Sequence, residues 1–381
     1  MKRRLVIITE LIAPYRIPVF NALAKRPELD LQVIFLSRTD GSMRQWRVYE
    51  DEINFSYQVL PSWRRRVGRF NVLLNRGIAT ALSKICPDVL ICGGYNYLAS
   101  WQAMRWAKRK RVPFLLWSES TANDLRNQRA IPEMLKRKFI SNCDAFVVPG
   151  ISARKYLLSF GVPAAKIFLA RNAVDTALFS AQVAAAARVR HDVRARFALP
   201  ERYFLYVGRL VHSKGVLDLL DAYAQLAPEL RSEVSMVFAG DGPLRAELEA
   251  RAREIHPGCV HFSGFVHRED LGSYYALAEC FVFPTRTDPW GLVVNEAMAC
   301  RLPVICTRVA GCAADLVREN GRLVSPGDIR ELGAAMAEIA NDLALRNRMA
   351  SESGVLIQDY SPEICAAGFA EASSALEAYA V

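Results

Sequence analysis

Residues 203–216 read Tyr203-Phe204-Leu205-Tyr206-Val207-Gly208-Arg209-Leu210-Val211-His212-Ser213-Lys214-Gly215-Val216. The first five residues form an apolar run rich in aromatic side chains, which predicts a buried strand over 203–207. A turn bounded by two glycines follows, and an amphipathic pattern from residue 216 predicts a helix. A strand, a turn and a helix in this order are the repeating unit of a parallel sheet that is covered by helices.

The same alternation runs outward from this stretch through the whole chain. We expect strands at Leu5–Ile8, Leu31–Phe35, Val89–Cys92, Phe114–Trp117, Ala145–Val148, Ser235–Ala239, Val260–Phe262, Cys280–Phe283 and Pro303–Cys306. Amphipathic stretches such as Ile17–Ala24 and Leu98–Arg109 lie between them, and a last one covers Pro362–Ala380. Residues 175–200 are Ala-rich and charged, which predicts a connection with an entry helix. The pattern predicts two doubly wound α/β domains, whose ligands bind beyond the carboxyl ends of the strands.

Composition narrows the class of protein. The chain has 381 residues and is 52% apolar, which suits two domains of ordinary size. No apolar run is long enough to span a membrane, and the first apolar run is interpreted as a strand, not as a signal peptide. The nine cysteines are odd in number and never spaced as Cys-x-x-Cys. We therefore expect a reducing, cytoplasmic environment without a disulfide framework or a zinc site.

The positive charge is concentrated in the first half of the chain. Residues 1–176 carry 29 Lys and Arg against 13 Asp and Glu, whereas the remainder carries 20 against 26. The excess comes in clusters at 64–66, 108–111 and 136–138, and Trp46, Trp63, Trp101 and Trp106 lie in the same half. Such clusters suit an anionic membrane surface, acceptor phosphates or a nucleic acid. For a single cluster a solvated helix face is the alternative, and the tryptophans can equally be core residues.

The turn after Tyr203–Val207 has the chemistry of an anion site. Arg209 and Lys214 lie five residues apart between Gly208 and Gly215, on a loop that leads into a helix N-terminus. Glycine allows close backbone approach, and the helix dipole adds positive potential. A solvated turn with two basic residues is the alternative.

A second turn of this kind follows the strand Cys280–Phe283. It reads Pro284-Thr285-Arg286-Thr287-Asp288-Pro289-Trp290-Gly291-Leu292-Val293-Val294-Asn295-Glu296-Ala297-Met298-Ala299-Cys300. A helix that starts near Gly291 places Asp288 just before it and Glu296 about one and a half turns inside it. Carboxylates bind sugar hydroxyls well, and the free amides of the first helical turn suit an anion. A cap for Asp288 and a surface position for Glu296 are the alternatives.

The two blocks together resemble the family-four retaining glycosyltransferases. Five further segments match the pattern of that family in its order: Arg171–Asp175, Ala239–Leu244, Phe262–Val266, Val309–Cys312 and Asn320–Asp328. The resemblance covers essentially residues 170–330. In the N-terminal half only the architecture and the turn Ala13–Arg16 suggest it.

The resemblance implies a GT-B fold, in which two Rossmann-like domains enclose the active site in the interdomain cleft. An acceptor-binding domain would span residues 1–178 and be completed by the C-terminal helix 357–381. A donor-binding domain would span residues 185–356. The implied enzyme is a glycosyltransferase of the hexosyltransferase type, with a nucleotide-sugar donor.

The resemblance also implies a role for each motif residue. Arg209 and Lys214 would neutralise the donor diphosphate, Glu296 would hold the ribose, and Asp288 would contact the sugar hydroxyls. The remaining donor-binding positions are Gly208, the backbone of Gly264, Phe265 and Val266 that would face the base, and the helix start at Trp290, Gly291, Leu292 and Val293.

Three departures from the family pattern stand out. The first acid of the usual Glu-x7-Glu pair is Asp288. The usual glycine pair in the first turn is replaced by Pro14-Tyr15-Arg16, so that Arg16 is a candidate for the diphosphate. The usual His-Asp turn reads Ser118-Glu119-Ser120, and residues 1–190 contain no histidine. Glu119 is therefore the candidate base or hydroxyl-orienting group, with an N-cap or a buried hydrogen-bonding role as the alternative.

The hypothesis that follows is transfer of a sugar, with retention, from a UDP-sugar (or a GDP-sugar) to a hydroxyl of a lipid-linked or polysaccharide acceptor in cell-surface polysaccharide biosynthesis. No metal or other cofactor is expected, because Arg209 and Lys214 supply the counter-charge and no Asp-x-Asp motif lies near these turns. The alternatives are a sugar-nucleotide epimerase or phosphorylase on the same scaffold, or a polyanion-binding protein. Nucleic acid is not an expected partner, because the basic clusters lack interleaved aromatics. A cytoplasmic protein, peripheral on the inner face of the cell membrane, is the expected location.

Overall fold

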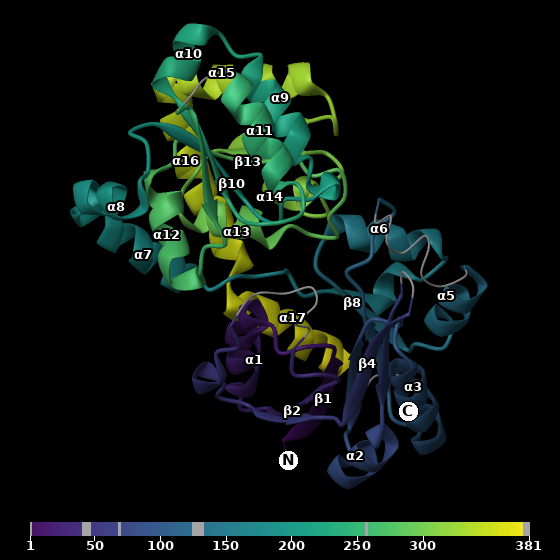
Figure 1. Ribbon diagram of the computed structural model, residues 1–381. Helices are drawn as coiled ribbons and strands as arrows, with labels where there is room; N and C mark the ends of the chain where they lie inside the picture. The colour runs from purple at the N-terminus through teal and green to yellow at the C-terminus, as the bar shows by residue number, and fades with distance from the viewer. Residues whose placement is uncertain (1, 40–46, 68–69, 124–132, 256–257, 376–381) are drawn as a thin grey trace. The chain divides into compact units, whose positions relative to one another are not determined.

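The structure, a computed structural model, describes residues 2–39, 47–67, 70–123, 133–255 and 258–375. It divides into two compact units, the first of Met1–Val174 with Pro362–Val381 and the second of Asp175–Ser361 (Figure 1). Trp46 and the end of the expected last helix, residues 376–380, lie outside the described part of the chain.

Unit 1 is built on a seven-stranded sheet with the order β3-β2-β1-β6-β7-β8-β9, in which all neighbours are parallel. Its strands are β1 (Arg3–Thr9), β2 (Leu29–Phe35), β3 (Ser56–Val59), β6 (Val89–Gly93), β7 (Phe114–Trp117), β8 (Ala145–Val148) and β9 (Ile167–Leu169), with the separate pair β4 (Ser62–Val67) and β5 (Phe70–Asn75). Its helices are α1 (Ile17–Ala24), α2 (Ile78–Ile85), α3 (Leu98–Lys110), α5 (Glu133–Ile140), α6 (Ile151–Ser159) and α17 (Pro362–Ser374), with short 3-10 turns η1 (Pro14–Arg16), η2 (Glu50–Glu52) and η3 (Ala164–Lys166).

Alternate residues of the central strands pack on opposite faces of this sheet. Leu5 and Ile7 of β1 belong to a core with residues of α1 and α17, whereas Val6 and Ile8 belong to a second core with residues of α2, α3 and α6. Because successive side chains of a strand point to opposite faces, a strand covered on both faces reads as a continuous apolar run. This is why the central strands are visible in the sequence. The C-terminal helix α17 packs on α1 and completes the first core.

Unit 2 contains a six-stranded parallel sheet with the order β12-β11-β10-β13-β14-β15. The strands are β10 (Tyr203–Val207), β11 (Ser235–Ala239), β12 (Val260–Gly264), β13 (Cys280–Phe283), β14 (Val304–Thr307) and β15 (Gly321–Val324). The helices are α7 (Thr176–Arg188), α8 (Arg190–Phe197), α9 (Val216–Ala224), α10 (Pro228–Glu233), α11 (Arg245–Ile255), α12 (Arg268–Leu277), α13 (Leu292–Ala299), α14 (Ala313–Leu316), α15 (Ile329–Asn341) and α16 (Leu343–Leu356), with 3-10 turns η4 (His212–Lys214) and η5 (Ile357–Tyr360).

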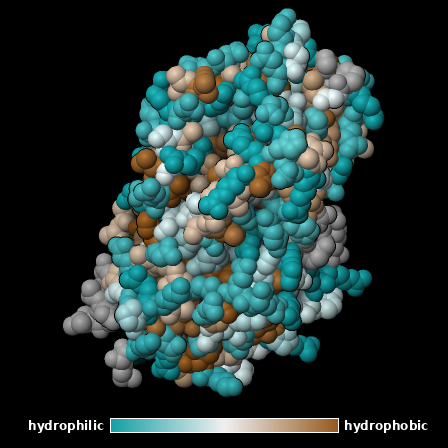
Figure 2. Space-filling view, turned by 90° about the vertical axis from the view of Figure 1, so that its left-hand side faces the viewer, coloured by the Kyte–Doolittle hydropathy of each residue, from teal (hydrophilic) through white to brown (hydrophobic). Residues whose placement is uncertain are grey.

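Every strand expected from the sequence is present, and both sheets are the parallel, helix-covered sheets that the alternation predicts (Figure 1). The sequence reading did not identify β3, β9 and β15 or the antiparallel pair β4–β5. No described helix is both long and apolar enough to span a membrane. On the face that Figure 2 shows, hydrophilic residues predominate and apolar residues form separate patches.

Candidate active site

The candidate donor site lies where the strand order of unit 2 reverses. The sheet runs from β10 to β11 and β12 on one side and from β10 to β13 and β14 on the other. The loops that follow β10 and β13 therefore leave the same edge of the sheet in opposite directions, which is the usual ligand position in an open α/β sheet. Arg209 and Lys214 are on the first loop, and Asp288 and Glu296 follow the second strand.

The backbone at Gly208 is held by the neighbouring loop after β11. Gly208 has a φ of +147°, and its amide N–H donates to the carbonyl oxygen of Ala239 over 3.1 Å. The amide of Leu210 donates to Asp241 O over 2.9 Å. A Cβ on Gly240 would lie 1.8 Å from Gly208 O, so only glycine allows this approach. The start of the basic loop is thus fixed by backbone contacts.

The other end of the basic loop packs on the loop after β13. Lys214 closes the 3-10 turn η4, and Gly215 follows in the left-handed region with a φ of +66°. A Cβ on Gly215 would lie 2.0 Å from Pro284 O, and the amide of Arg286 donates to Ser213 O over 3.0 Å. These contacts bring Lys214 to the segment that carries Asp288.

Lys214 and Asp288 form an ion pair through Nζ and Oδ2. The ammonium also lies 5.6 Å from the centroid of the Phe283 ring. The other oxygen of Asp288, Oδ1, accepts a hydrogen bond of 3.0 Å from the amide of Trp290. Asp288 therefore does not cap helix α13 itself, because its bond closes the turn in front of that helix. The Trp290 amide, which the resemblance implies for ligand binding, is engaged by Asp288.

Arg209 differs from Lys214 in that its side chain is exposed and makes no ion pair with any residue that the structure describes. Its backbone carbonyl accepts a hydrogen bond of 2.9 Å from the hydroxyl of the buried Tyr206. The loop thus presents one free guanidinium and one ammonium that is paired with a carboxylate.

The start of helix α13 offers unsatisfied amides. Gly291 precedes it with a φ of +98°, and a Cβ there would lie 2.6 Å from Phe283 Cε1. The first amides of a helix have no partner within the helix. In the described part of the chain, no residue accepts a hydrogen bond from the amides of Gly291, Leu292 or Val293. These three N–H groups can bind an anion.

Glu296 lies on α13 and is fixed by a tyrosine from another helix. The hydroxyl of Tyr275, on α12, donates to Glu296 Oε2 over 2.8 Å, and the Tyr275 ring is fully buried. Burial raises the pKa of the Glu296 carboxyl to about 7, although the hydrogen bond from Tyr275 acts in the opposite direction. The carboxyl is half-buried by accessible surface, so one side remains open to a ligand.

The loop after β12 continues the same edge of the sheet. Gly264 pairs with Gly240, which in turn packs on Gly208. Gly264 is in the left-handed region with a φ of +71°, and Phe265 is 40% exposed. The loops after β10, β12 and β13 at this edge therefore carry the predicted donor-binding positions, and Val266 lies on the loop after β12.

Sequence reasoning missed two side chains that support this site. Tyr275 lies in a helix that reads as ordinary amphipathic sequence, so nothing in its local pattern signals a hydrogen bond to Glu296. Asn295 stands in the quoted block only as a residue of the predicted helix, but it is fully buried and its Oδ1 accepts from Trp290 Nε1 over 2.8 Å. This bond anchors the Trp290 side chain against α13 and so fixes the turn that carries Asp288.

In unit 1, Arg16, Glu119 and Asn172 meet at the carboxyl edge of the sheet, after β1, β7 and β9. Arg16 Nη2 pairs with Glu119 Oε1, and Arg16 Nη1 donates to Asn172 Oδ1 over 3.2 Å. Asn172 Nδ2 donates to the same Glu119 oxygen over 3.1 Å. The structure thus joins both candidate residues of the N-terminal half in one hydrogen-bonded cluster.

Arg16 is almost fully buried in this cluster. Its guanidinium carbon lies 4.0 Å from the centroid of the Trp117 ring. Burial opposes the charged form, but Glu119 outweighs it and raises the pKa of Arg16. Arg16 therefore serves as the fixed partner of Glu119, and contact between Arg16 and a diphosphate stays a prediction. Glu119 keeps part of its side chain exposed, with a relative accessibility of 32%.

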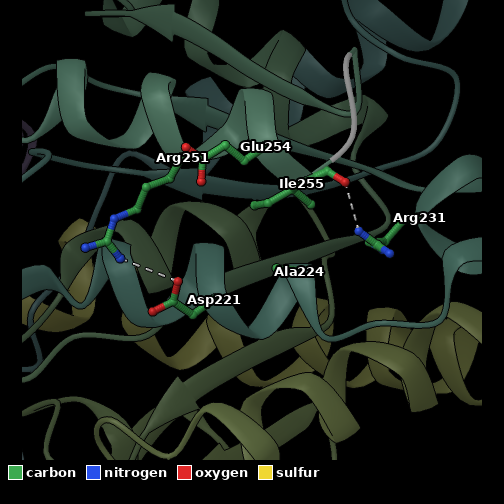
Figure 3. Close-up of a pocket in the computed structure, with 6 residues that line it drawn as sticks. All are labelled: Asp221, Ala224, Arg231, Arg251, Glu254 and Ile255. Atoms are coloured by element: carbon green, nitrogen blue, oxygen red, sulfur yellow. Dashed lines mark hydrogen bonds and ion pairs between the residues drawn. The ribbon is translucent and has the colours of Figure 1, made fainter.

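A separate pocket of about 520 Å³ lies among helices of unit 2 (Figure 3). It is lined by Asp221, Ala224, Arg231, Arg251, Glu254 and Ile255. Arg251 pairs with Asp221 at 3.6 Å, and Arg231 donates to Ile255 O over 3.3 Å. Asp221 and Ala224 lie in the last turns of α9, away from the N-terminus of this helix that follows the basic loop. This pocket is therefore separate from the candidate site. Within the described ranges, no group of three or more His, Cys, Asp or Glu side chains could hold a metal ion.

Two family models match the chain and together cover both halves. Residues 190–354 match "Glycosyl transferases group 1", and residues 21–178 match "Glycosyltransferase Family 4".

Three curated relatives match over a little less than half of the chain. Alpha-D-kanosaminyltransferase of Streptomyces kanamyceticus is 34% identical over 172 residues, which are 44% of this chain and 44% of that protein. O-antigen chain mannosyltransferase B of Escherichia coli is 30% identical over 168 residues, 43% of each chain. The putative teichuronic acid biosynthesis glycosyltransferase TuaC of Bacillus subtilis is 29% identical over 165 residues, 43% of this chain and 40% of TuaC. The match thus spans less than half the length of these relatives.

Solved structures share the fold over the whole chain. HepE of Anabaena in complex with UDP superposes with a TM-score of 0.75 at 18% identity, covering 99% of this chain and 100% of HepE. Sucrose-phosphate synthase of Thermosynechococcus elongatus gives a TM-score of 0.74 at 22% identity, with full coverage of both chains. These similarities, together with the two parallel sheets, confirm the expected fold of two Rossmann-like domains. The chain thus carries a glycosyltransferase family 4 domain followed by a group 1 glycosyl transferase domain, on the GT-B fold.

Proposed function

We propose that this protein transfers a sugar from a nucleoside diphosphate sugar to a hydroxyl group of a lipid-linked or polysaccharide acceptor, with retention at the anomeric carbon. The donor is a UDP-sugar in this proposal, and a GDP-sugar is the second choice. The acceptor would belong to cell-surface polysaccharide biosynthesis, and the protein would act in the cytoplasm at the inner face of the cell membrane. The named roles of relatives such as TuaC and the O-antigen mannosyltransferase agree with this acceptor class.

One observation carries the donor half of the proposal. Arg209, Lys214 and the free amides of Gly291–Val293 converge at the switch point of the unit 2 sheet, with Glu296 on the helix that these amides begin. A guanidinium, an ammonium and a helix N-terminus together suit a diphosphate. A carboxylate with one oxygen fixed by Tyr275 and one open side suits the hydroxyls of a ribose. HepE, which has the same fold, was solved with UDP, and this supports uridine as the base.

The proposed step breaks the bond between the anomeric carbon and the diphosphate oxygen and forms a bond from that carbon to the acceptor oxygen. Negative charge grows on the departing diphosphate, where Arg209, Lys214 and the α13 amides oppose it. The acceptor hydroxyl attacks from the side of the leaving group, and its proton passes to a diphosphate oxygen. In this scheme the protein needs no strong base and no metal ion, because cationic side chains and helix amides supply the counter-charge.

Asp288 has a conditional role in this scheme. It now holds the Lys214 ammonium, so a bound diphosphate would compete with Asp288 for that cation. Asp288 would then be free to accept a hydrogen bond from a sugar hydroxyl through Oδ2. Its Oδ1 stays on the Trp290 amide, which keeps the carboxylate in place.

We place the acceptor at the carboxyl edge of the unit 1 sheet, where Glu119 is partly exposed. Arg16 and Asn172 share one Glu119 oxygen, Oε1, and leave Oε2 to orient an acceptor hydroxyl. That the donor and the acceptor meet in an interdomain cleft stays a prediction.

The test is thermal stabilisation of the protein by a panel of nucleoside diphosphates and their sugars. A ligand at 100 times its dissociation constant adds about 2.7 kcal/mol to the folded state, which raises the Tm of a domain of this size by about 5–10 °C. We expect this shift with UDP. Lys214→Ala should weaken binding roughly 10- to 100-fold, because it removes a charged contact to phosphate.

Arg188→Ala is the matched control, since Arg188 is exposed on α7 and makes no ion pair with a described residue. It should bind like the wild type. If no nucleoside diphosphate stabilises the wild-type protein, the proposed function is wrong. If one does so equally in the wild type and in Lys214→Ala, the assigned site is wrong.

A further inference from the structure

The positive charge of this protein comes from one contiguous segment of unit 1. Residues 53–118 contain eleven Lys and Arg and a single acid, Asp88, for a net charge of +10. The whole chain has a formal net charge of +10, so the other residues sum to zero. The single acid is already engaged, because Asp88 accepts from the amide of Arg4 over 2.8 Å.

Most of these cations are exposed and unpaired. Eight of them have exposed side chains and form no ion pair with a residue that the structure describes: Arg65, Arg76, Lys84, Arg105, Lys108, Arg109, Lys110 and Arg111. Arg64 is the exception, with a salt bridge of 3.0 Å to Glu10. A favourable helix dipole accounts for the cations in the last turns of α2 and α3, but not for Arg65 on β4, Arg76 after β5 or Arg105 in the middle of α3. The absence of acids over this stretch leaves a strong positive potential.

The elements that carry these cations lie side by side. Helix α2 packs on α3, and α3 packs on β5 (Figure 1). The buried Leu73 of β5 belongs to the same core as residues of α2 and α3, so the hairpin β4–β5 covers these helices with one face. On the other face of the hairpin, the side chains of Trp63, Arg65 and Leu74 are exposed.

That exposed face is apolar beside its cation. Trp63 and Leu74 are directly opposed across the hairpin, and they are 51% and 42% exposed. Arg65 lies two residues after Trp63 and therefore on the same face. An exposed indole and a leucine next to unpaired cations are the composition of a surface that enters a lipid interface. A single-stranded nucleic acid could also stack a base on the indole, but it offers no apolar phase for the exposed Leu74.

We propose that the β4–β5 hairpin with α2 and the C-terminal end of α3 forms a docking surface for a bilayer of anionic phospholipid, in which Trp63 and Leu74 enter the interface and the cations contact the headgroups. We call this surface the hairpin platform. The inference deepens the membrane location that is part of the proposed function, but it does not depend on the transfer reaction or the donor site.

The experiment is co-sedimentation of the full-length protein with vesicles of phosphatidylcholine alone, or of two parts phosphatidylcholine to one part phosphatidylglycerol. Binding is expected only with phosphatidylglycerol, and it should weaken with salt. Arg109→Glu/Lys110→Glu should bind at least about 25-fold more weakly, since each cation near an anionic surface contributes a factor of about five. Arg188→Glu/Arg190→Glu in unit 2 makes the same change of charge at exposed positions and should bind like the wild type.

A second measurement separates the bilayer from a soluble polyanion. Phosphatidylcholine with brominated acyl chains, included in the anionic vesicles, should quench part of the tryptophan fluorescence, and Trp63→Ser should abolish that part. Leu74→Ser should weaken vesicle binding but leave binding to polyuridylate unchanged, because leucine enters an acyl phase but does not stack on bases. Equal binding of the charge-reversed platform and the wild type would overturn the inference. The inference would also be overturned if the fluorescence of Trp63 were not quenched and the protein bound polyuridylate more tightly than vesicles. Both results leave nucleotide binding unaffected, so they are distinguishable from failure of the proposed function.

Discussion

Substitution of Glu296 by Gln should stabilise the free protein while weakening its proposed ligand site. The Glu296 carboxyl is held beside α12 by Tyr275, and burial raises its pKa from 4.5 to about 7. Below pH 4.5 the Glu296 carboxyl is protonated in both the folded and the unfolded chain, so its burial carries no ionisation penalty and the folded state is at its most stable with respect to this group. As the pH rises from 4.5 to 7, the unfolded chain ionises first and this stability is lost.

The size of the effect follows from the shift. A change of about 2.5 pH units corresponds to roughly 3 kcal/mol at 1.36 kcal/mol per unit, which is an upper limit. Because Glu296 is only half-buried, solvent screens part of the penalty, and we expect about 1–2 kcal/mol. Glutamine resembles the protonated carboxyl and can still accept the bond from Tyr275. Glu296→Gln should therefore equal the wild type near pH 4.5 and exceed it by about 1–2 kcal/mol above pH 7.

The assay is urea unfolding at pH 5, 6, 7 and 8, monitored by hydrogen exchange. Peptides of β10, β11 and β13 are used because they report on unit 2 alone. Glu352→Gln, at an exposed position of α16, is the control for loss of one negative charge. The same Glu296→Gln protein should bind UDP more weakly at pH 8. A stability difference that does not change with pH, or a less stable Glu296→Gln protein at pH 8, would refute the reasoning.

Three further substitutions test other contacts. Tyr275→Phe should weaken UDP binding but not binding of 2′,3′-dideoxy-UDP, because the main bond that it removes is the one that orients Glu296 for the ribose, with a longer contact of 3.4 Å to Val293 O. Calorimetry with both ligands checks this, and equal losses would contradict it. Gly215→Ala should lower the free energy of unfolding in urea by about 2–4 kcal/mol, since its Cβ would lie 2.0 Å from a carbonyl oxygen. Gly258→Ala, also at positive φ but with nothing within 4 Å of its Cβ, should lower it by only about 1 kcal/mol. Similar losses in the two variants would argue against the clash. Arg16→Ala should destabilise unit 1 by about 3–5 kcal/mol, measured by hydrogen exchange in peptides of β1 and β7, because it leaves a partly buried carboxylate unpaired; an unchanged stability would contradict the buried ion pair.

The strands that the sequence predicts and those that it does not differ in their position in the sheet. Central strands such as β1 and β10 are covered on both faces, so their sequences are continuously apolar and easy to recognise. The missed strands β3, β9 and β15 each lie at the edge of a sheet, are three or four residues long and contain half-exposed or exposed positions. Short strands that bury little apolar surface leave no clear period in the sequence. The β4–β5 hairpin was hidden for a related reason, because three consecutive arginines read as a charge cluster.

The donor-site residues were predictable because glycines and charged side chains in two short blocks carry them. The partners of these residues were not predictable. Tyr275 and Glu296 are 21 residues apart on different helices, and Arg16 and Glu119 are 103 residues apart. Such pairs arise only when parallel strands and their helices are placed side by side. For the same reason the sequence suggested Arg16 and Glu119 as independent groups, whereas the structure makes them one ion pair.

The central claim is that the carboxyl edge of the unit 2 sheet binds a nucleoside diphosphate. Hydrogen–deuterium exchange of the protein with and without saturating UDP tests this most directly. The account predicts protection in the peptides that contain residues 208–215 and 288–296, and loss of this protection in Lys214→Ala. Protection confined to other segments, or to the pocket of Figure 3 around Arg231 and Arg251, would contradict it.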